Sequence, residues 1–212
     1  MFYSSGKLLS SAMFFVAGVG LMSCQTTQPE TSQPVTRLAP MQKPSPTPKG
    51  AVIHGIRNGT PTSTRVVKFD GKIRVLERAN GCVYTRDLTH GYFAPTASWE
   101  NCNGSSGHTI FHGKSGNIWP LQVGKSVKYR ATGRTGSAWG ATRTCKVEDQ
   151  VRIKTHTGTH DTFKVVCRSE WATRVSYMSP KLGRAVKYSQ RKAKPESRTT
   201  KVDWELTRIE LP

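Results

Sequence analysis

The sequence predicts an all-β protein: a single antiparallel sandwich or curved half-barrel domain that follows a disordered, proline-rich tether. Many short β-rich segments are separated by Gly, Pro and Ser-Gly breaks, which is typical of antiparallel sheets. An Asp-Gly pair lies between two of these segments, a strong hairpin signal. No window keeps apolar residues at i, i+3, i+4 and i+7 for three turns, so no helix is expected. The chain therefore divides into a signal peptide (1–23), a tether (24–50) and a β domain (51–212).

Residues 1–23 have the composition of a targeting segment. Lys7 is their only charge, and the apolar stretch that follows it ends at Met22, short of the ~20 residues that span a bilayer. The ending Leu-Met-Ser-Cys24 resembles the lipobox of bacterial lipoproteins. The resemblance implies cleavage before Cys24, fatty acylation (including palmitate) of its thiol, and a place in the cell envelope. Gln25, where an Asp would be the retention signal, resembles the enterobacterial sorting pattern that implies the outer membrane. An ordinary signal peptide or an uncleaved anchor is the alternative.

The tether is rich in proline and lacks aromatic residues. Such a composition buries too little apolar surface to offset the entropy lost on ordering. In polyproline II form, at ~3.1 Å per residue, the tether would reach at most about 80 Å. Its prolines are Pro29, Pro34, Pro40, Pro44, Pro46 and Pro48.

The β domain is expected to begin with a hairpin over 66–76 that turns at Asp70-Gly71, followed by a short strand at 82–85. A long irregular loop is expected over 90–107. Further strands are predicted at 109–112, 126–130, 142–148, 151–155, 162–171, 174–178, 184–190 and 202–209.

The four cysteines after Cys24 form an even set in a chain expected to be exported, which favours disulfides. We favour the pairs Cys82–Cys102 and Cys145–Cys167, because each closes a short loop at a low entropic cost. Zinc binding is the alternative, although the spacing contains no C-x₂-C pair.

Residues 118–206 contain three motifs: Trp119-Pro-Leu-Gln-Val-Gly124, Gly158-Thr-His-Asp-Thr-Phe-Lys-Val165 and Tyr177-Met-Ser-Pro-Lys-Leu-Gly183. With Trp204-Glu-Leu206, the set resembles a group of uncharacterised proteobacterial envelope proteins. The resemblance implies a curved antiparallel sheet and a periplasmic location, and it implies no reaction. His160 stands where that group has an aromatic residue.

The chain is strongly basic, with 32 Lys+Arg against 13 Asp+Glu. Without Lys7 the mature protein carries 31 − 13 = +18. This charge favours anionic partners: lipopolysaccharide phosphates, acidic glycan or anionic lipid. The expected contact is a basic stretch of eight residues near the C-terminus; a solvated loop is the alternative. Its members are Lys181, Arg184, Lys187, Arg191, Lys192, Lys194, Arg198 and Lys201.

No catalytic or metal site is predicted. The Gly-Lys-Ser triplets at 113 and 124 lack the upstream glycine of a phosphate loop, and Ser189-x-x-Lys192 lacks its partner motifs. The carboxylates form no acid–base pair pattern. His156 and His160 could approach each other in a hairpin loop, but only Asp161 lies near as a third ligand, so exposed histidines are expected. Sequence-specific nucleic-acid binding is not expected, since no reader motif is present.

The expected function is therefore that of a non-enzymatic, membrane-anchored envelope lipoprotein without cofactor, whose basic β domain contacts anionic envelope components in a structural or assembly role. The alternative is a periplasmic carrier that binds a lipid or another apolar ligand in a curved sheet lined by Phe163, Val165 and Trp171. An envelope hydrolase is a third possibility.

Overall fold

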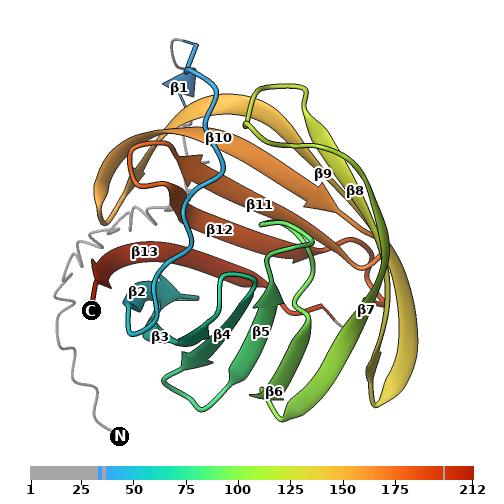
Figure 1. Ribbon diagram of the computed structural model, residues 1–212. Helices are drawn as coiled ribbons and strands as arrows, with labels where there is room; N and C mark the ends of the chain where they lie inside the picture. Colours follow the sequence, from blue (N-terminus) through green and yellow to red (C-terminus); the bar gives the residue numbers. More distant parts are fainter. Residues whose placement is uncertain (1–32, 35–36, 198) are drawn as a thin grey trace, which may run out of the picture. The chain divides into compact units, whose positions relative to one another are not determined.

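The computed structural model describes residues 33–34, 37–197 and 199–212, which belong to one compact unit. All of its regular elements are strands (Figure 1), and the described residues contain no helix that is long and apolar enough to cross a membrane. The strands are β1 (Gln33–Pro34), β2 (Val52–Arg57), β3 (Thr60–Phe69), β4 (Ile73–Arg78), β5 (Val83–Asp87), β6 (Ser98–Cys102), β7 (Ser105–Gly116), β8 (Ser126–Thr135), β9 (Ser137–Thr155), β10 (Gly158–Arg168), β11 (Ala172–Ser179), β12 (Arg184–Lys192) and β13 (Val202–Glu210).

Twelve of these strands, β2 to β13, form one antiparallel sheet that closes into a barrel. Neighbours in the chain pair as hairpins, and β13 pairs with β2. The long hairpin of β8 and β9 pairs over ten positions from Ser126↔Lys146 to Thr135↔Ser137, and this pairing closes the ring. The β9 strand continues past β8, where β1 pairs with it at Arg152. The all-β antiparallel prediction is confirmed.

The predicted hairpin turn is present between β3 and β4. Asp70 accepts hydrogen bonds through Oδ1 from the backbone N–H groups of Lys72 (3.0 Å) and Ile73 (2.7 Å). The prediction of an irregular loop over 90–107 was wrong in its second half, which contains β6 and the start of β7. The segments predicted at 142–148 and 151–155 are one strand, β9, with a bulge opposite Lys164 and Val165.

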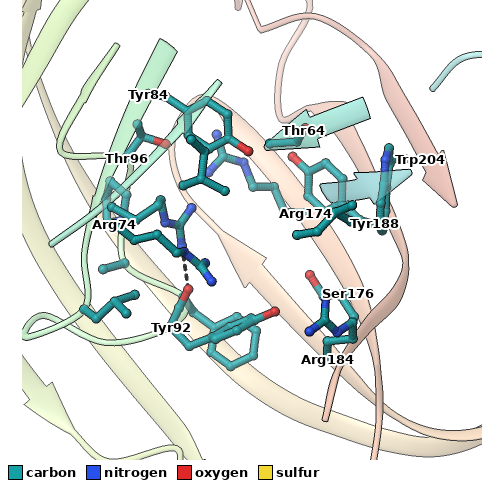
Figure 2. Close-up of a pocket in the computed structure, with 18 of the residues that line it drawn as sticks. Thr64, Arg74, Tyr84, Tyr92, Thr96, Arg174, Ser176, Arg184, Tyr188 and Trp204 are labelled. Carbon is teal, nitrogen blue, oxygen red and sulfur yellow. Dashed lines mark hydrogen bonds between the residues drawn. The ribbon is translucent and has the colours of Figure 1, made fainter. Parts of the chain in front are cut away.

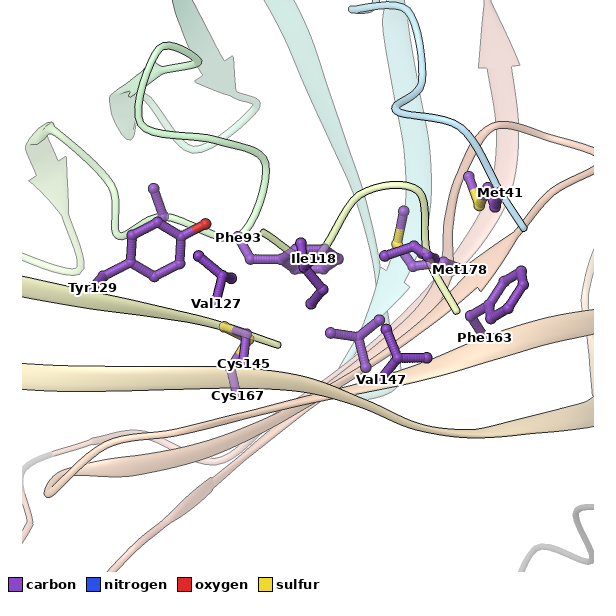
Figure 3. Close-up of a cluster of buried hydrophobic side chains, with 13 residues drawn as sticks. Met41, Phe93, Ile118, Val127, Tyr129, Cys145, Val147, Phe163, Cys167 and Met178 are labelled. Carbon is purple, nitrogen blue, oxygen red and sulfur yellow. A yellow bond between two sulfur atoms is a disulfide. The ribbon is translucent and has the colours of Figure 1, made fainter. Parts of the chain in front are cut away.

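The main apolar core lies where β8 to β11 meet two loops (Figure 3). Phe163, Val147 and Val165 are fully buried there, together with Leu121. Cys145 pairs with Cys167 across β9 and β10 at this core. The second disulfide joins Cys82 to Cys102. Both disulfides follow the connectivity that the loop-length argument favours.

Residues 37–50, which we call the strap, correct the prediction of a disordered tether over 24–50. Met41 is 6% exposed and exchanges two backbone hydrogen bonds with Leu121, at 3.1 and 2.8 Å. Thr47 is also 6% exposed, and the Leu38 backbone hydrogen-bonds the Gln150 side chain. The strap is ordered because the barrel supplies the apolar surface and hydrogen-bond partners that its own sequence lacks.

Candidate functional site: an arginine-lined cavity

The barrel encloses a cavity of about 600 Å³, within the ~300–1,000 Å³ typical of small-molecule sites. Strands from all around the barrel line it, as do the strap residues Lys43–Thr47 and the loop residues Tyr92–Thr96 (Figure 2). Phe93, Ala94 and Cys167 belong both to the cavity lining and to the main core. The core therefore forms part of the cavity wall.

The most distinctive feature of the cavity is its charge. Seven arginines from six strands line it, and no Asp or Glu is among the described lining residues. The period-two alternation of a strand explains their direction: Arg74, Leu76 and Arg78 share the inner face of β4. The seven are Arg57, Arg74, Arg78, Arg86, Arg143, Arg174 and Arg184.

Burial and mutual repulsion make this concentration of charge unfavourable. Burial lowers the pKa of Arg143 well below its usual value, and the nearby Arg174 and Arg86 lower it further. Burial likewise lowers the pKa of Arg86, with Arg74 and Arg174 acting in the same direction. Guanidinium groups still keep their proton in proteins, so the cavity holds an uncompensated positive charge.

Most arginine donors in the cavity remain available to a ligand. Arg86 donates from Nη2 to the carbonyl oxygen of Tyr92 (2.5 Å; dashed in Figure 2), and Arg143 donates from Nη1 to that of Phe93 at 3.5 Å. Arg174 donates from Nε to Oε1 of Gln190 at 2.6 Å. Each guanidinium has five N–H donors, so these bonds orient the side chains and leave further donors free.

Two further donors in the cavity are buried without a partner among the described residues. They are Nε of Arg74 and Nε of Arg184, and Arg184 also donates from Nη2 to the Thr47 hydroxyl at 3.3 Å. A buried N–H without an acceptor costs about 1–3 kcal/mol. An anion in the cavity would supply the missing acceptors.

Aromatic rings share the wall with the arginines. Tyr84, Tyr92, Tyr188 and Trp204 surround the space between the guanidinium groups (Figure 2). The guanidinium of Arg78 lies 5.0 Å from the centre of the Tyr84 ring, which is cation–π distance. The wall can therefore bind anionic groups and flat apolar groups side by side.

The structure separates the basic C-terminal residues that the sequence placed in one patch. Arg184 points into the cavity, whereas Arg191 pairs with Asp203 at 2.7 Å and Lys194 with Glu196 at 3.2 Å. Lys187 lies 3.9 Å from Glu205. Lys181, Lys192 and Lys201 are exposed, and nothing is described of the Arg198 side chain.

The histidines of the hairpin between β9 and β10 have protein partners, and the expectation of exposed histidines was wrong for His160, which is 6% exposed. His156 contacts Glu205 through its backbone N–H (2.6 Å) and its ring Nδ1 (2.5 Å), and the His160 ring lies 2.9 Å from the Thr157 hydroxyl. In the described part of the chain, no group of three or more His, Cys, Asp or Glu is placed to hold a metal ion. Cys24, the expected lipidation site, lies outside the described residues.

The residues expected to line an apolar carrier site lie elsewhere. Phe163 and Val165 are packed in the main core, and Trp171 is 40% exposed beneath Lys194. None of the three is among the residues that line the cavity.

The cavity is not evident from the sequence, because its arginines form no continuous basic stretch. The arginines recur at alternate positions of short strands that are far apart in the chain. Arg74 and Arg78 on one strand face, with apolar Ile73 and Val75 on the other, were the available signal. Only barrel closure brings such faces together.

No protein-family model and no curated protein matches the chain. Among solved structures, the chain is similar to the hypothetical lipoprotein YmcC from Escherichia coli K12, with a TM-score of 0.47 and 5% identity over 84% of this chain and 91% of that one. It is also similar to a protein from Bacteroides fragilis, described as exported and as having a YmcC-like fold, with a TM-score of 0.39 and 12% identity over 80% of this chain and 99% of that one.

Proposed function

We propose that this protein is a non-enzymatic, lipid-anchored protein of the cell envelope whose barrel binds an anionic envelope component in the arginine-lined cavity. The main observation that supports this proposal is that seven arginines face one cavity, without a carboxylate among the described lining residues. Lipopolysaccharide, acidic glycan and anionic lipid are the candidate partners. The anchor is the thiol of Cys24.

The physical basis is the release of charge repulsion on binding. An anion that enters the cavity offsets the unfavourable interactions among Arg86, Arg143 and Arg174, and it accepts hydrogen bonds from donors that have no partner. Arginine suits this role because its planar group binds phosphate and carboxylate through two parallel hydrogen bonds. The surface lysines, which are solvated, gain less from the same contact.

The test compares the loss of affinity when positive charges are removed from the cavity with the loss when they are removed from the surface. The non-acylated chain (Cys24→Ser) is titrated with lipopolysaccharide, polygalacturonate and phosphatidylglycerol vesicles by calorimetry. A charged hydrogen bond contributes about 1.5–3 kcal/mol, so Arg86→Gln with Arg143→Gln should weaken binding of the true partner by about a hundredfold or more. Binding should also weaken as salt rises.

The matched control removes two exposed charges, Lys192→Gln with Lys201→Gln, and should change affinity by less than about threefold. The proposal is wrong if none of the three probes binds, or if the cavity and surface pairs weaken binding equally. Circular dichroism of each variant checks that the barrel is intact.

A further inference from the structure

We propose that the ligand of the cavity carries two or more phosphate groups on a saccharide-like or polyol ring. This inference rests on the proposed function and specifies its ligand. Two independent observations support it: the distribution of the arginines and the position of three tryptophans.

The arginines require a ligand with more than one anionic group. Arg74 and Arg86 lie directly opposite each other on β4 and β5, and Arg143 and Arg174 are electrostatic neighbours of Arg86. Arg78 lies four residues beyond Arg74 on the same face of β4, a span of about 13 Å along a strand, so it belongs to a second set with its electrostatic neighbour Arg57. One monovalent anion would compensate a single member of one set, whereas several linked anionic groups can serve both.

Phosphate fits these sets better than a single carboxylate. A phosphate group offers three strong acceptor oxygens and up to two negative charges. The Nε donors of Arg74 and Arg184 have no acceptor among the described residues, and such oxygens can accept hydrogen bonds from them. A carboxylate has two oxygens and one charge, so it would satisfy fewer of these donors.

Three tryptophans line the cavity, and each packs against a glycine of the neighbouring strand. Trp204 covers Gly55, Trp99 covers Gly107 and Trp139 covers Gly133. A Cβ added at these glycines would lie 2.5, 2.5 and 2.2 Å from the respective indole, so the ring occupies the space of the missing side chain. All three tryptophans line the cavity, and Figure 2 shows Trp204 at its wall.

The packing of the tryptophans indicates which kind of organic group the cavity can bind. One face of each indole is covered by the sheet, so only the other face can contact a ligand. A single free face suits the C–H surface of a saccharide or polyol ring, which is attracted to the negative π-face. An acyl chain would require an apolar lining instead of seven arginines.

The experiment uses three small probes on the non-acylated chain: inositol hexakisphosphate, inorganic tripolyphosphate and myo-inositol. The first carries ring and phosphates, the second phosphates alone, and the third the ring alone. Inositol hexakisphosphate should bind about tenfold or more tightly than tripolyphosphate, and myo-inositol should not bind measurably at millimolar concentration. Equal affinity for inositol hexakisphosphate and tripolyphosphate would overturn the assignment of the ring.

A tryptophan substitution separates the contribution of the ring to binding from the contribution of the phosphate groups. Trp139→Leu should weaken inositol hexakisphosphate about threefold to tenfold and leave tripolyphosphate unchanged, because an aromatic face contributes about 0.5–1.5 kcal/mol. Trp171→Leu, outside the cavity, is the control and should change neither affinity. Should a cavity variant fail to fold, wild-type tryptophan fluorescence replaces it: emission must change at saturation with inositol hexakisphosphate, and unchanged emission contradicts the proposal.

Lipopolysaccharide before and after deacylation separates a lipid-linked ligand from its headgroup. Equal affinity of the two forms is expected, because the proposed contacts of the cavity involve only the phosphate groups and the ring of the ligand. Loss of binding on deacylation would overturn this inference. Cavity-dependent binding of another anion, without binding of inositol hexakisphosphate, would overturn the inference and leave the proposed function intact.

Discussion

Arginine side chains define the chemistry of this protein at the scale of single residues. Four inward arginines lose hydration and meet like charges, and burial is the main reason that their pKa values are lowered. They are Arg57, Arg86, Arg143 and Arg184. Desolvation and repulsion of these arginines lower the free energy of unfolding of the barrel. A ligand that binds only the folded barrel reduces this effect and should stabilise the barrel.

The single residue Tyr129 allows a prediction of how the stability of the barrel depends on pH. Burial raises the pKa of Tyr129 to about 12, against the opposing effect of Arg143 and Arg86. The unfolded chain releases this proton near pH 10, so the stabilising contribution is complete below pH 10 and is lost as pH rises toward 12. Tyr129→Phe should therefore show a shallower fall of thermal stability between pH 9 and 11.5. Identical pH profiles for wild type and Tyr129→Phe would contradict the prediction.

At the scale of strands, pairs of tryptophan and glycine set the inner surface of the barrel. Gly107 lies directly opposite Trp99, and Gly133 lies directly opposite Trp139. A glycine in a strand normally weakens it, and here it permits close approach of an indole. The strands therefore combine a closed wall with a flat aromatic surface.

Gly133→Ala tests this packing. The added methyl carbon would lie 2.2 Å from Trp139 and 2.5 Å from the carbonyl oxygen of His108, so the ring or the backbone must move. We expect a loss of about 1–3 kcal/mol in the free energy of unfolding, measured by urea denaturation. The control is Gly140→Ala on β9, where the nearest atom would lie 3.8 Å away, and it should change stability by less than about 0.5 kcal/mol. Equal effects of both substitutions would show that the indole is not held against Gly133.

The strands were predicted unevenly from the sequence. The hairpin at Asp70-Gly71 and the segments corresponding to β8 to β13 were recognised, because turn residues and β-branched runs carry a local signal. β1, β2 and β6 were missed. Gly55 interrupts β2, and β6 follows a loop and contains few β-formers; pairing with neighbouring strands stabilises both.

At the scale of the whole molecule, ring closure creates the site. The β8–β9 hairpin joins the two ends of the twelve-strand sheet, and this encloses faces that an open half-barrel would leave in solvent. The strap then connects the expected membrane anchor to the cavity. Residues Lys43–Thr47 of the strap line the cavity, so the segment that follows Cys24 in the chain also forms part of the cavity wall.

The anchor is tested by Cys24→Ser expressed in a bacterial host. Acylation by at least two chains is needed for stable membrane attachment, so the variant should leave the membrane fraction and appear in the soluble envelope fraction. Mass spectrometry of wild type should show a mature chain that begins at Cys24 and carries fatty acids. Wild-type material that lacks the fatty acids, or a variant that remains with membranes, would contradict the lipoprotein assignment.

The sequence by itself determined the all-β antiparallel class, the hairpin at Asp70-Gly71 and the excess of basic residues. These properties are local or additive, so they can be read without knowing which distant residues meet. Only the tertiary structure decided that the sheet closes, that the strap is ordered and that arginines from six strands face one cavity. These features depend on contacts between residues far apart in the chain, and the register of strand pairing fixes which side chains point inward.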